Sequence, residues 1–142
     1  MTITENYKIL AKYIKDMSCE TPDVETYLYV RENISKYHLN IEITSKAIKN
    51  KMIEISTTLK FEDKNNSEKK SIFEIVYCTV VNISDTIQNK KDLQKIVLCD
   101  IQKKIYPDLE TSFLNLLHSS GYPDVKFDKK IDFDDLYNKE FN

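Results

Sequence analysis

Glycine and tryptophan are scarce in this chain, which has one glycine, Gly121, and no tryptophan among its 142 residues. A phosphate-binding loop of the P-loop or dinucleotide type needs several glycines in a short run, so neither kind of nucleotide site is expected. Runs of about 18 apolar residues are also missing, which excludes a membrane-spanning helix. The opening MTITENYKIL lacks the basic start and apolar core of a signal peptide, so we expect a cytoplasmic protein.

Cysteine content and charge balance argue against a disulfide-rich protein, a metal-binding protein and a nucleic-acid-binding protein. The three cysteines, Cys19, Cys78 and Cys99, are odd in number and widely spaced, so we expect neither a disulfide framework nor a metal site. A net charge of -2 lacks the basic footprint of nucleic-acid binding. The chain is 41% hydrophobic and 31% charged, which is typical of a globular protein. Its length fits one domain, residues 1–142.

Alternating apolar and polar residues predict three strands, over residues 37–46, 52–62 and 71–83. In the second, Ile53, Ile55 and Leu59 face one way and polar residues the other, as in a sheet with one buried face. The connection KAIKNK is short enough for a hairpin. Further segments are expected at 7–17, as an edge strand, and at 24–30, as a helical turn.

The third predicted strand, SIFEIVYCTVVNI, is apolar on both faces. Phe73, Ile75 and Tyr77 share one face, whereas Val76 and Cys78 lie on the other. A strand of this kind is covered on both sides. In so short a chain a second copy of the protein is the economical cover, and a helix packed on the second face is the alternative.

Amphipathic helices are expected after the strands. Apolar spacing predicts a helix from about residue 93 to 105, which Pro107 should interrupt or kink, and a continuation over 108–119 that ends at Gly121 as a C-cap. A last helix, DFDDLYNKEF, has Asp132 as its N-cap. Strands first and helices last indicate the α+β class.

Few side chains suggest catalysis. No GxSxG elbow occurs. The acids around Asp134 are explained by helix capping and dipole, and neither His38 nor His118 has a convincing nucleophile or carboxylate partner. We therefore predict no enzyme and no cofactor; an enzyme or small-ligand binder with a deep preformed pocket is the rival. In KDMSCETPD, Asp16 and Glu20 would share one strand face, which by itself indicates only a solvated surface.

Four blocks of the chain resemble the SecB protein-export chaperones. The first block, YIKDMSCETPD, is similar to the family's Tyr-x-Lys-Asp-x-Ser-x-Glu-x-Pro opening, and the second, SIFEIVYCTVVNI, contains Ile-Phe-Glu-Ile where the family has a Leu-x-Glu-Val core. The third block, IYPDLETSFLNLLHSSGYP, is similar to the family's aromatic-Pro helix and the Gly-aromatic-Pro turn that follows it. The fourth, IDFDDLY, is similar to the family's closing Asp/Asn-Phe-x-x-Leu-aromatic helix. Together they cover residues 13–137 in the family's order.

The resemblance implies a four-stranded antiparallel sheet with a long helix and a short C-terminal helix packed on one side. It also implies a homotetramer, a dimer of dimers, that holds unfolded preproteins without ATP and delivers them to the export motor SecA. The basic, zinc-bearing C-terminal tail of SecA would contact the acids Asp16, Glu20 and Glu74 and the apolar Ile72. The zinc would belong to that partner, and neither nucleic acid nor membrane insertion is implied.

Further roles follow from the same resemblance. Phe73, Ile75 and Tyr77 match family positions that affect tetramer assembly. Aromatic candidates for lining a client groove are Tyr106, Phe113, Tyr122 and Phe127. Two rivals share this general architecture: a SecB-like chaperone that guards an antitoxin, and a dedicated effector-secretion chaperone, which is typically a dimer.

Overall fold

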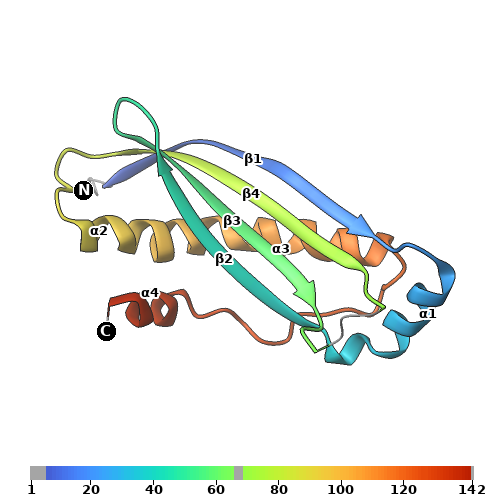
Figure 1. The fold of residues 1–142 in the computed structure, drawn as a ribbon. Coiled ribbons are helices and arrows are strands. Elements are labelled where there is room, and N and C mark those ends of the chain that lie inside the picture. Colours follow the sequence, from blue (N-terminus) through green and yellow to red (C-terminus); the bar gives the residue numbers. More distant parts are fainter. Residues whose placement is uncertain (1–5, 66–68, 142) are drawn as a thin grey trace.

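A four-stranded antiparallel sheet forms one layer of the protein (Figure 1). The computed structural model describes residues 6–65 and 69–141, so residues 1–5 of the N-terminal segment and 66–68 of the polar connection after the second predicted strand lie outside it. The strands are β1 (Tyr7–Glu20), β2 (His38–Ala47), β3 (Met52–Glu62) and β4 (Ile72–Ile83), in the order β1-β4-β3-β2. The predicted strands are confirmed, including the edge strand β1, which extends beyond residue 17.

Helical segments cover one face of the sheet and, in the case of α1 and the turn after it, one of its ends (Figure 1). They are α1 (Val24–Glu32), the 3-10 turn η1 (Ile34–Lys36), α2 (Lys90–Lys95), the π-helical η2 (Ile96–Asp100), α3 (Ile101–Ser119) and α4 (Phe133–Phe141). Residues 90–119 follow one another without a break and run along one face of the sheet, called the inner face here. The α+β prediction is confirmed. Within the described residues, no helix combines the length and apolarity needed to cross a membrane.

The core lies between the inner face and this long helical segment. Ile75 and Leu59 of the sheet are buried in one cluster with Leu109, Phe113 and Leu117 of α3. Residues from the other end of the sheet and the start of the helix form a second cluster, which includes Ile55, Val81, Ile101 and Ile105. Each fully buried side chain of this size stabilises the fold by about 1.5–3 kcal/mol. The inner face of β4 is thus covered within the protomer.

Pro107 lies inside α3, so of its two predicted effects, an interruption or a kink of the helix, the interruption is wrong. Proline removes the N–H that would reach the carbonyl of Lys103, four residues earlier. Lys103 and Pro107 are both exposed, so water can satisfy that carbonyl. The neighbouring Tyr106 and Leu109 are buried against the core and hold the helix in place.

A π-helical turn at η2 was not predicted, and a buried glutamine accompanies it. Gln102 is fully buried, and its Nε2 donates to the carbonyl of Val97 at 3.1 Å. Its Oε1 accepts from Thr57 Oγ1 of β3 at 3.0 Å. Because the side chain has a partner in the helix and another in the sheet, it links the two layers at one position.

Turns and caps follow local chemistry. The β2–β3 hairpin turns at Asn50 and Lys51, with φ of 57° and 62°, and the amide of Met52 donates to the carbonyl of Lys49 at 3.1 Å; two such residues match the type I′ turn. Gly121, with φ of 108°, follows the C-cap of α3. The amide of Asp135 donates to Asp132 Oδ1 at 3.0 Å, which confirms the predicted N-cap of α4.

Candidate functional site

The four residues predicted to contact a partner lie together on the outer face of the sheet. Strand pairing places Glu20 opposite Ile72, Ser18 opposite Glu74, and Asp16 opposite Val76. Directly opposed residues of antiparallel strands point to the same face. Asp16 and Glu20 are exposed, Ile72 is 46% exposed, and Glu74 is half-buried. The result is an accessible surface that combines three carboxylates with one isoleucine, and we call it the acidic face.

A fourth carboxylate on the outer face is already engaged. Glu54 of β3 accepts from Tyr13 OH at 2.8 Å and lies 3.9 Å from Lys15 Nζ. The hydrogen bond to Glu54 is the main reason that the pKa of Tyr13 is well above its usual value. Sequence alternation alone did not reveal this contact, because it joins two strands that are not adjacent in the sheet. Glu54 is therefore a fixed part of the sheet surface rather than a free contact for a partner.

The three residues predicted at an oligomer interface share the inner face of β4. Phe73 is 2% exposed and Ile75 is 0% exposed, and both belong to the core under α3. Any effect of these two on assembly would therefore be indirect. Tyr77 is half-buried and lies opposite Ile14, which is 46% exposed. An apolar strip on the edge strand β1 thus adjoins Tyr77.

The loop between α3 and α4 borders three hollows, which together we call the loop groove. The first, of ≈ 530 Å³, lies beside α1 and is lined by Tyr27, Arg31, Ile34 and residues 121–125. The second, of ≈ 690 Å³, lies beside the start of β2 and the end of β3 and is lined by Tyr37, His38, Leu39, Phe61, residues 126–131, Leu136 and Lys139. The third, of ≈ 400 Å³, lies beside α3 and is lined by Lys103, Tyr106, Pro107, Glu110, Thr111, Lys130, Ile131 and Phe133.

Three of the four predicted groove aromatics line these hollows. Phe127 lines the second and is half-buried, Tyr122 lines the first, and Tyr106 lines the third. Phe113 is fully buried in the core and offers no surface. Tyr37, which sequence analysis did not single out, also lines the second hollow. Its alternation with Leu39 would have suggested a buried aromatic.

Two buried tyrosine hydroxyls beside the loop groove form no close hydrogen bond among the described residues, although Tyr37 lies near the backbone N–H of Ser71 and Tyr106 near Glu110. They belong to Tyr37 and Tyr106, whose side chains are more than nine-tenths buried. Burial raises the pKa of both hydroxyls above the usual value, because the charged phenolate is disfavoured away from water. Both groups therefore stay neutral at pH 7.

Side chains from two helices anchor the loop. His118 of α3 donates from Nε2 to the carbonyl of Val125 at 2.8 Å. Tyr27 OH of α1 donates to the carbonyl of Gly121 at 2.8 Å. The sequence prediction placed His118 near a helix end without a partner; its partner is a backbone carbonyl, which no side-chain pattern could reveal.

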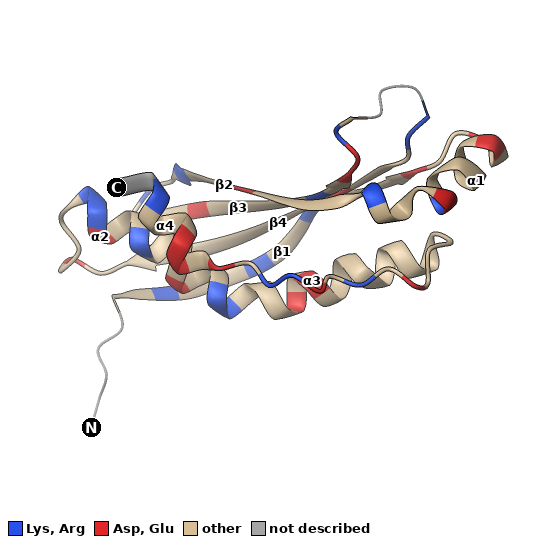
Figure 2. Ribbon diagram, turned by 90° about the horizontal axis from the view of Figure 1, so that it is seen from below, with Lys and Arg blue, Asp and Glu red and all other residues tan. Residues whose placement is uncertain are grey.

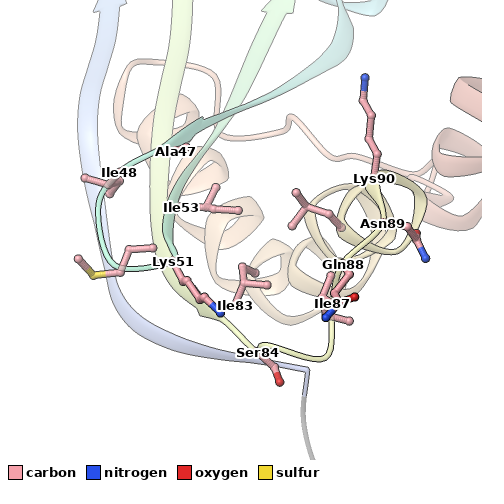
Figure 3. A pocket seen from close by; sticks show the side chains of 12 residues that line it. Ala47, Ile48, Lys51, Ile53, Ile83, Ser84, Ile87, Gln88, Asn89 and Lys90 are labelled. Carbon is pink, nitrogen blue, oxygen red and sulfur yellow. The ribbon is translucent and has the colours of Figure 1, made fainter.

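A further hollow lies at the opposite end of the sheet. It measures ≈ 430 Å³ and is lined by side chains from the β2–β3 hairpin, the end of β4 and the start of α2 (Figure 3). Ile53, Ile83 and Ile87 contribute apolar surface there. None of the residues that the sequence analysis predicted to form a functional site lines this hollow.

Asp134 and Cys99 have a structural role. Asp134 of α4 accepts from Cys99 Sγ at 3.0 Å and pairs with Lys103 Nζ at 2.9 Å. The Cys99 hydrogen bond and the Lys103 ammonium lower the pKa of Asp134, and burial raises the pKa of the Cys99 thiol. These contacts attach α4 to the long helix. Across residues 6–65 and 69–141, no group of three potential metal-ligating side chains comes together.

Comparison with known proteins assigns the whole chain to one group. The family model described as "Preprotein translocase subunit SecB" matches residues 2–142. A "Putative protein-export protein SecB" of Pelagibacter ubique is 56% identical over 140 residues, which cover 99% of this chain and 100% of that protein. A "Protein-export protein SecB" of Rhodospirillum centenum is 22% identical over 130 residues, 92% of this chain and 76% of that one.

The fold is also similar to a solved structure. A SecB-like chaperone of Mycobacterium tuberculosis, in complex with a peptide from an antitoxin, aligns with a TM-score of 0.58. The alignment covers 88% of this chain and 91% of that chain at 11% identity. At this identity the likeness supports the fold alone.

Proposed function

Because this chain belongs to the SecB family of chaperones, we propose that it holds unfolded preproteins in the cytoplasm without ATP and delivers them to the export motor SecA. The observation that carries the proposal is the family match over residues 2–142, with 56% identity to a putative protein-export SecB. Holding is a matter of mass action, because binding lowers the concentration of free unfolded chain and delays its folding. No chemical step is required of the protein.

The loop groove is the proposed client site. Its second hollow presents the half-buried Phe127 beside Tyr37 and Phe61, and such aromatic surface suits the apolar segments that an unfolded chain exposes. The Phe61 and Phe127 rings lie 5.6 Å apart, edge to face, which is a favourable arrangement that a client aromatic ring can join. Contacts of this kind tolerate many client sequences.

The acidic face is the proposed contact for the basic tail of SecA. Asp16 and Glu20 are exposed on the outer face of β1, and the apolar Ile72 lies opposite Glu20 on the neighbouring strand β4. Exposed carboxylates of this kind attract a basic partner and raise its association rate more than its affinity. The contact therefore suits a transfer step, in which the partner must bind quickly and leave again.

Assembly into a homotetramer, a dimer of dimers, completes the proposal. Ile14 and Met17 on the inner face of β1 are 46% and 49% exposed and lie opposite Tyr77 and Ile75. The long helix leaves this strip uncovered in the protomer, and a second copy would bury it. Phe73 and Ile75 would then influence assembly by setting the position of the helix above them.

Native mass spectrometry tests the holding function first. We expect a tetramer that binds an unfolded preprotein and ignores the same protein after it has folded. A monomer or dimer without affinity for the unfolded chain would contradict the proposal. A dimer that binds one effector only would favour a dedicated secretion chaperone.

A charge reversal tests the SecA contact. Glu20→Lys should weaken binding of a peptide with the sequence of the SecA tail, loaded with zinc, by about threefold to tenfold, because exposed charge pairs contribute about 0.2–1 kcal/mol each and the new lysine also repels. Glu42→Lys is the matched control, since Glu42 is exposed on β2 at the far edge of the same face. Equal effects of the two substitutions, or a parallel loss of client binding, would refute the assignment of the acidic face.

A further inference from the structure

The turn between β2 and β3 combines positive charge with an exposed aliphatic side chain. Its sequence over residues 46–51, KAIKNK, holds three lysines and no acid, and all of these residues are exposed. Ile48, in the middle of the turn, is 47% exposed. Lys90 and Lys91 at the start of α2 are exposed as well, and Lys90 lines the same hollow as Ile48. We call residues 46–51 together with Lys90 and Lys91 the hairpin end.

The carboxylates near the hairpin end are few and already have partners. Asp85 pairs with Lys51, and Asp92 belongs to the cap of α2. The third, Glu54, lies opposite Lys46 in the β2–β3 pairing and also contacts β1. Five lysines against these three carboxylates leave a net charge of +2 at the hairpin end, in a chain whose net charge is -2.

Three lysines of the hairpin end have no ion-pair partner in the part of the chain that the structure describes. They are Lys49, Lys90 and Lys91. The side chain of Lys90 points away from the hollow (Figure 3), and Figure 2 shows basic segments, drawn in blue, on α2. Positive charge at the hairpin end therefore faces outward, where a negatively charged partner can reach it.

Backbone hydrogen bonds hold the hairpin end in a fixed shape. The amide of Ile48 donates to the carbonyl of Met52 at 2.8 Å across the turn. The amide of Ile83 in β4 donates to the carbonyl of Lys51 at 2.9 Å, which ties the turn to the neighbouring strand. Because the turn is preorganised, binding a partner requires little ordering of its backbone.

Aliphatic side chains beside the lysines indicate which kind of polyanion fits. Ile53, Ile83 and Ile87 line the hollow of ≈ 430 Å³ next to Ile48, and its described lining includes neither an aromatic side chain nor an arginine. Single-stranded nucleic acids are bound largely by stacking on aromatic and arginine side chains. An anionic lipid surface instead offers negative headgroups to lysines and hydrocarbon to an exposed aliphatic side chain.

We propose that the hairpin end binds the surface of membranes that contain anionic phospholipids. The contact is peripheral: the lysines lie against the phosphate headgroups, and Ile48 enters the boundary between headgroups and acyl chains. The acidic face lies at the other end of β1 and β4, so its carboxylates do not oppose this contact. The proposal adds a partner to the protein and depends neither on client holding nor on SecA.

Vesicle flotation with the complete protein tests the proposal. The probes are vesicles of phosphatidylcholine alone and vesicles of phosphatidylcholine and phosphatidylglycerol in equal parts. At low salt we expect binding to the anionic vesicles to be at least about tenfold stronger than to the neutral ones, since each lysine near an anionic surface strengthens binding about fivefold. High salt should reduce the difference, because the charges are then screened.

Three variants assign the contact to the hairpin end. Lys49→Glu combined with Lys90→Glu should weaken binding to anionic vesicles by about tenfold or more. Lys126→Glu combined with Lys129→Glu, an equal change of net charge on the exposed α3–α4 loop, should leave binding nearly unchanged. Ile48→Ser should weaken it by about threefold to tenfold without changing its salt dependence. Circular dichroism and native mass spectrometry check that every variant keeps the fold and the assembly.

Each outcome decides the proposal. Equal binding to the two kinds of vesicle, or binding to neither, would overturn it. Equal losses in the two double variants would show a general effect of net charge and overturn the assignment to the hairpin end. Binding to soluble polyglutamate that needs the same lysines but not Ile48, without binding to vesicles, would identify an acidic protein as the partner instead. Client holding is measured without vesicles, so its result stands apart from these.

Discussion

Replacing each of two buried threonines of the inner face with valine should change stability in opposite directions. Thr57 and Thr79 are both 0% exposed, on the adjacent strands β3 and β4. Thr57 Oγ1 donates to Gln102 Oε1 at 3.0 Å. Thr79 Oγ1 has no hydrogen-bond partner among the residues that the structure describes. The two substitutions have the same shape change and differ in what the hydroxyl contacts.

The magnitudes follow from these contacts. Thr57→Val removes one hydrogen bond and leaves the buried Oε1 of Gln102 without a donor, a loss of about 1–3 kcal/mol. The added methyl recovers about 0.8 kcal/mol, so we expect a net destabilisation of about 1–2 kcal/mol. Thr79→Val removes a buried hydroxyl that has no partner, and we expect it to stabilise by about 1 kcal/mol.

Urea unfolding at one fixed protein concentration measures both effects, since assembly makes apparent stability depend on concentration. The midpoint should fall for Thr57→Val and rise for Thr79→Val, with unchanged slopes. In a Gln102→Leu background the loss from Thr57→Val should shrink, because its partner is gone. Shifts of the same sign and size for both threonines would refute the hydrogen-bond argument.

Three further predictions concern two turns and the contacts of Asp134. Gly121→Ala should lower the unfolding free energy by about 1–3 kcal/mol, measured by urea unfolding, because φ is 108° and the new Cβ would lie 2.7 Å from Tyr27 Cε1. Lys51→Gly should raise it by about 0.5–1 kcal/mol in the same assay, since Lys51 has a φ of 62°. Asp134→Asn should destabilise at pH 7, with a deficit that shrinks as pH falls below about 4: contacts with Cys99 and Lys103 lower the pKa of Asp134, so its contribution is present above the unfolded pKa and lost in acid.

The central strands β3 and β4 could be predicted from the sequence because one face of each is buried. Ile55, Leu59 and Ile75 alternate with partly exposed residues, and period-two alternation reports that environment directly. Pro107 misled the helix prediction because proline propensity is local, whereas packing of Leu109 and Phe113 against the sheet is not. The π-helical turn has no sequence signal, since its polar contacts depend on Thr57, which is 45 residues away from Gln102.

Of the two candidate sites, the acidic face could be predicted from the sequence and the loop groove only in part. Within Asp16 to Glu20 the alternation predicted a shared face, and pairing with β4 confirms that these acids lie on the face of Ile72 and Glu74. The roles assigned to them remain proposals. The loop groove was less accessible to prediction, because three lysines spaced along a loop look like any solvated segment. Only the fold shows that Lys126, Lys129 and Lys130 surround Tyr37 and Phe127.

An irregularity in β1 determines which face the acids occupy. The pairing runs from Ile14 opposite Tyr77 to Asp16 opposite Val76, so one extra residue is accommodated between them. Without this bulge, simple alternation from Ile14 would place Asp16 opposite Ile75, on the inner face with the core. The bulge instead turns Asp16 outward, away from the side on which the loop groove lies. On the proposed function, a client in the groove and a basic partner on the acidic face therefore share no contact residue, and the two can be bound at the same time.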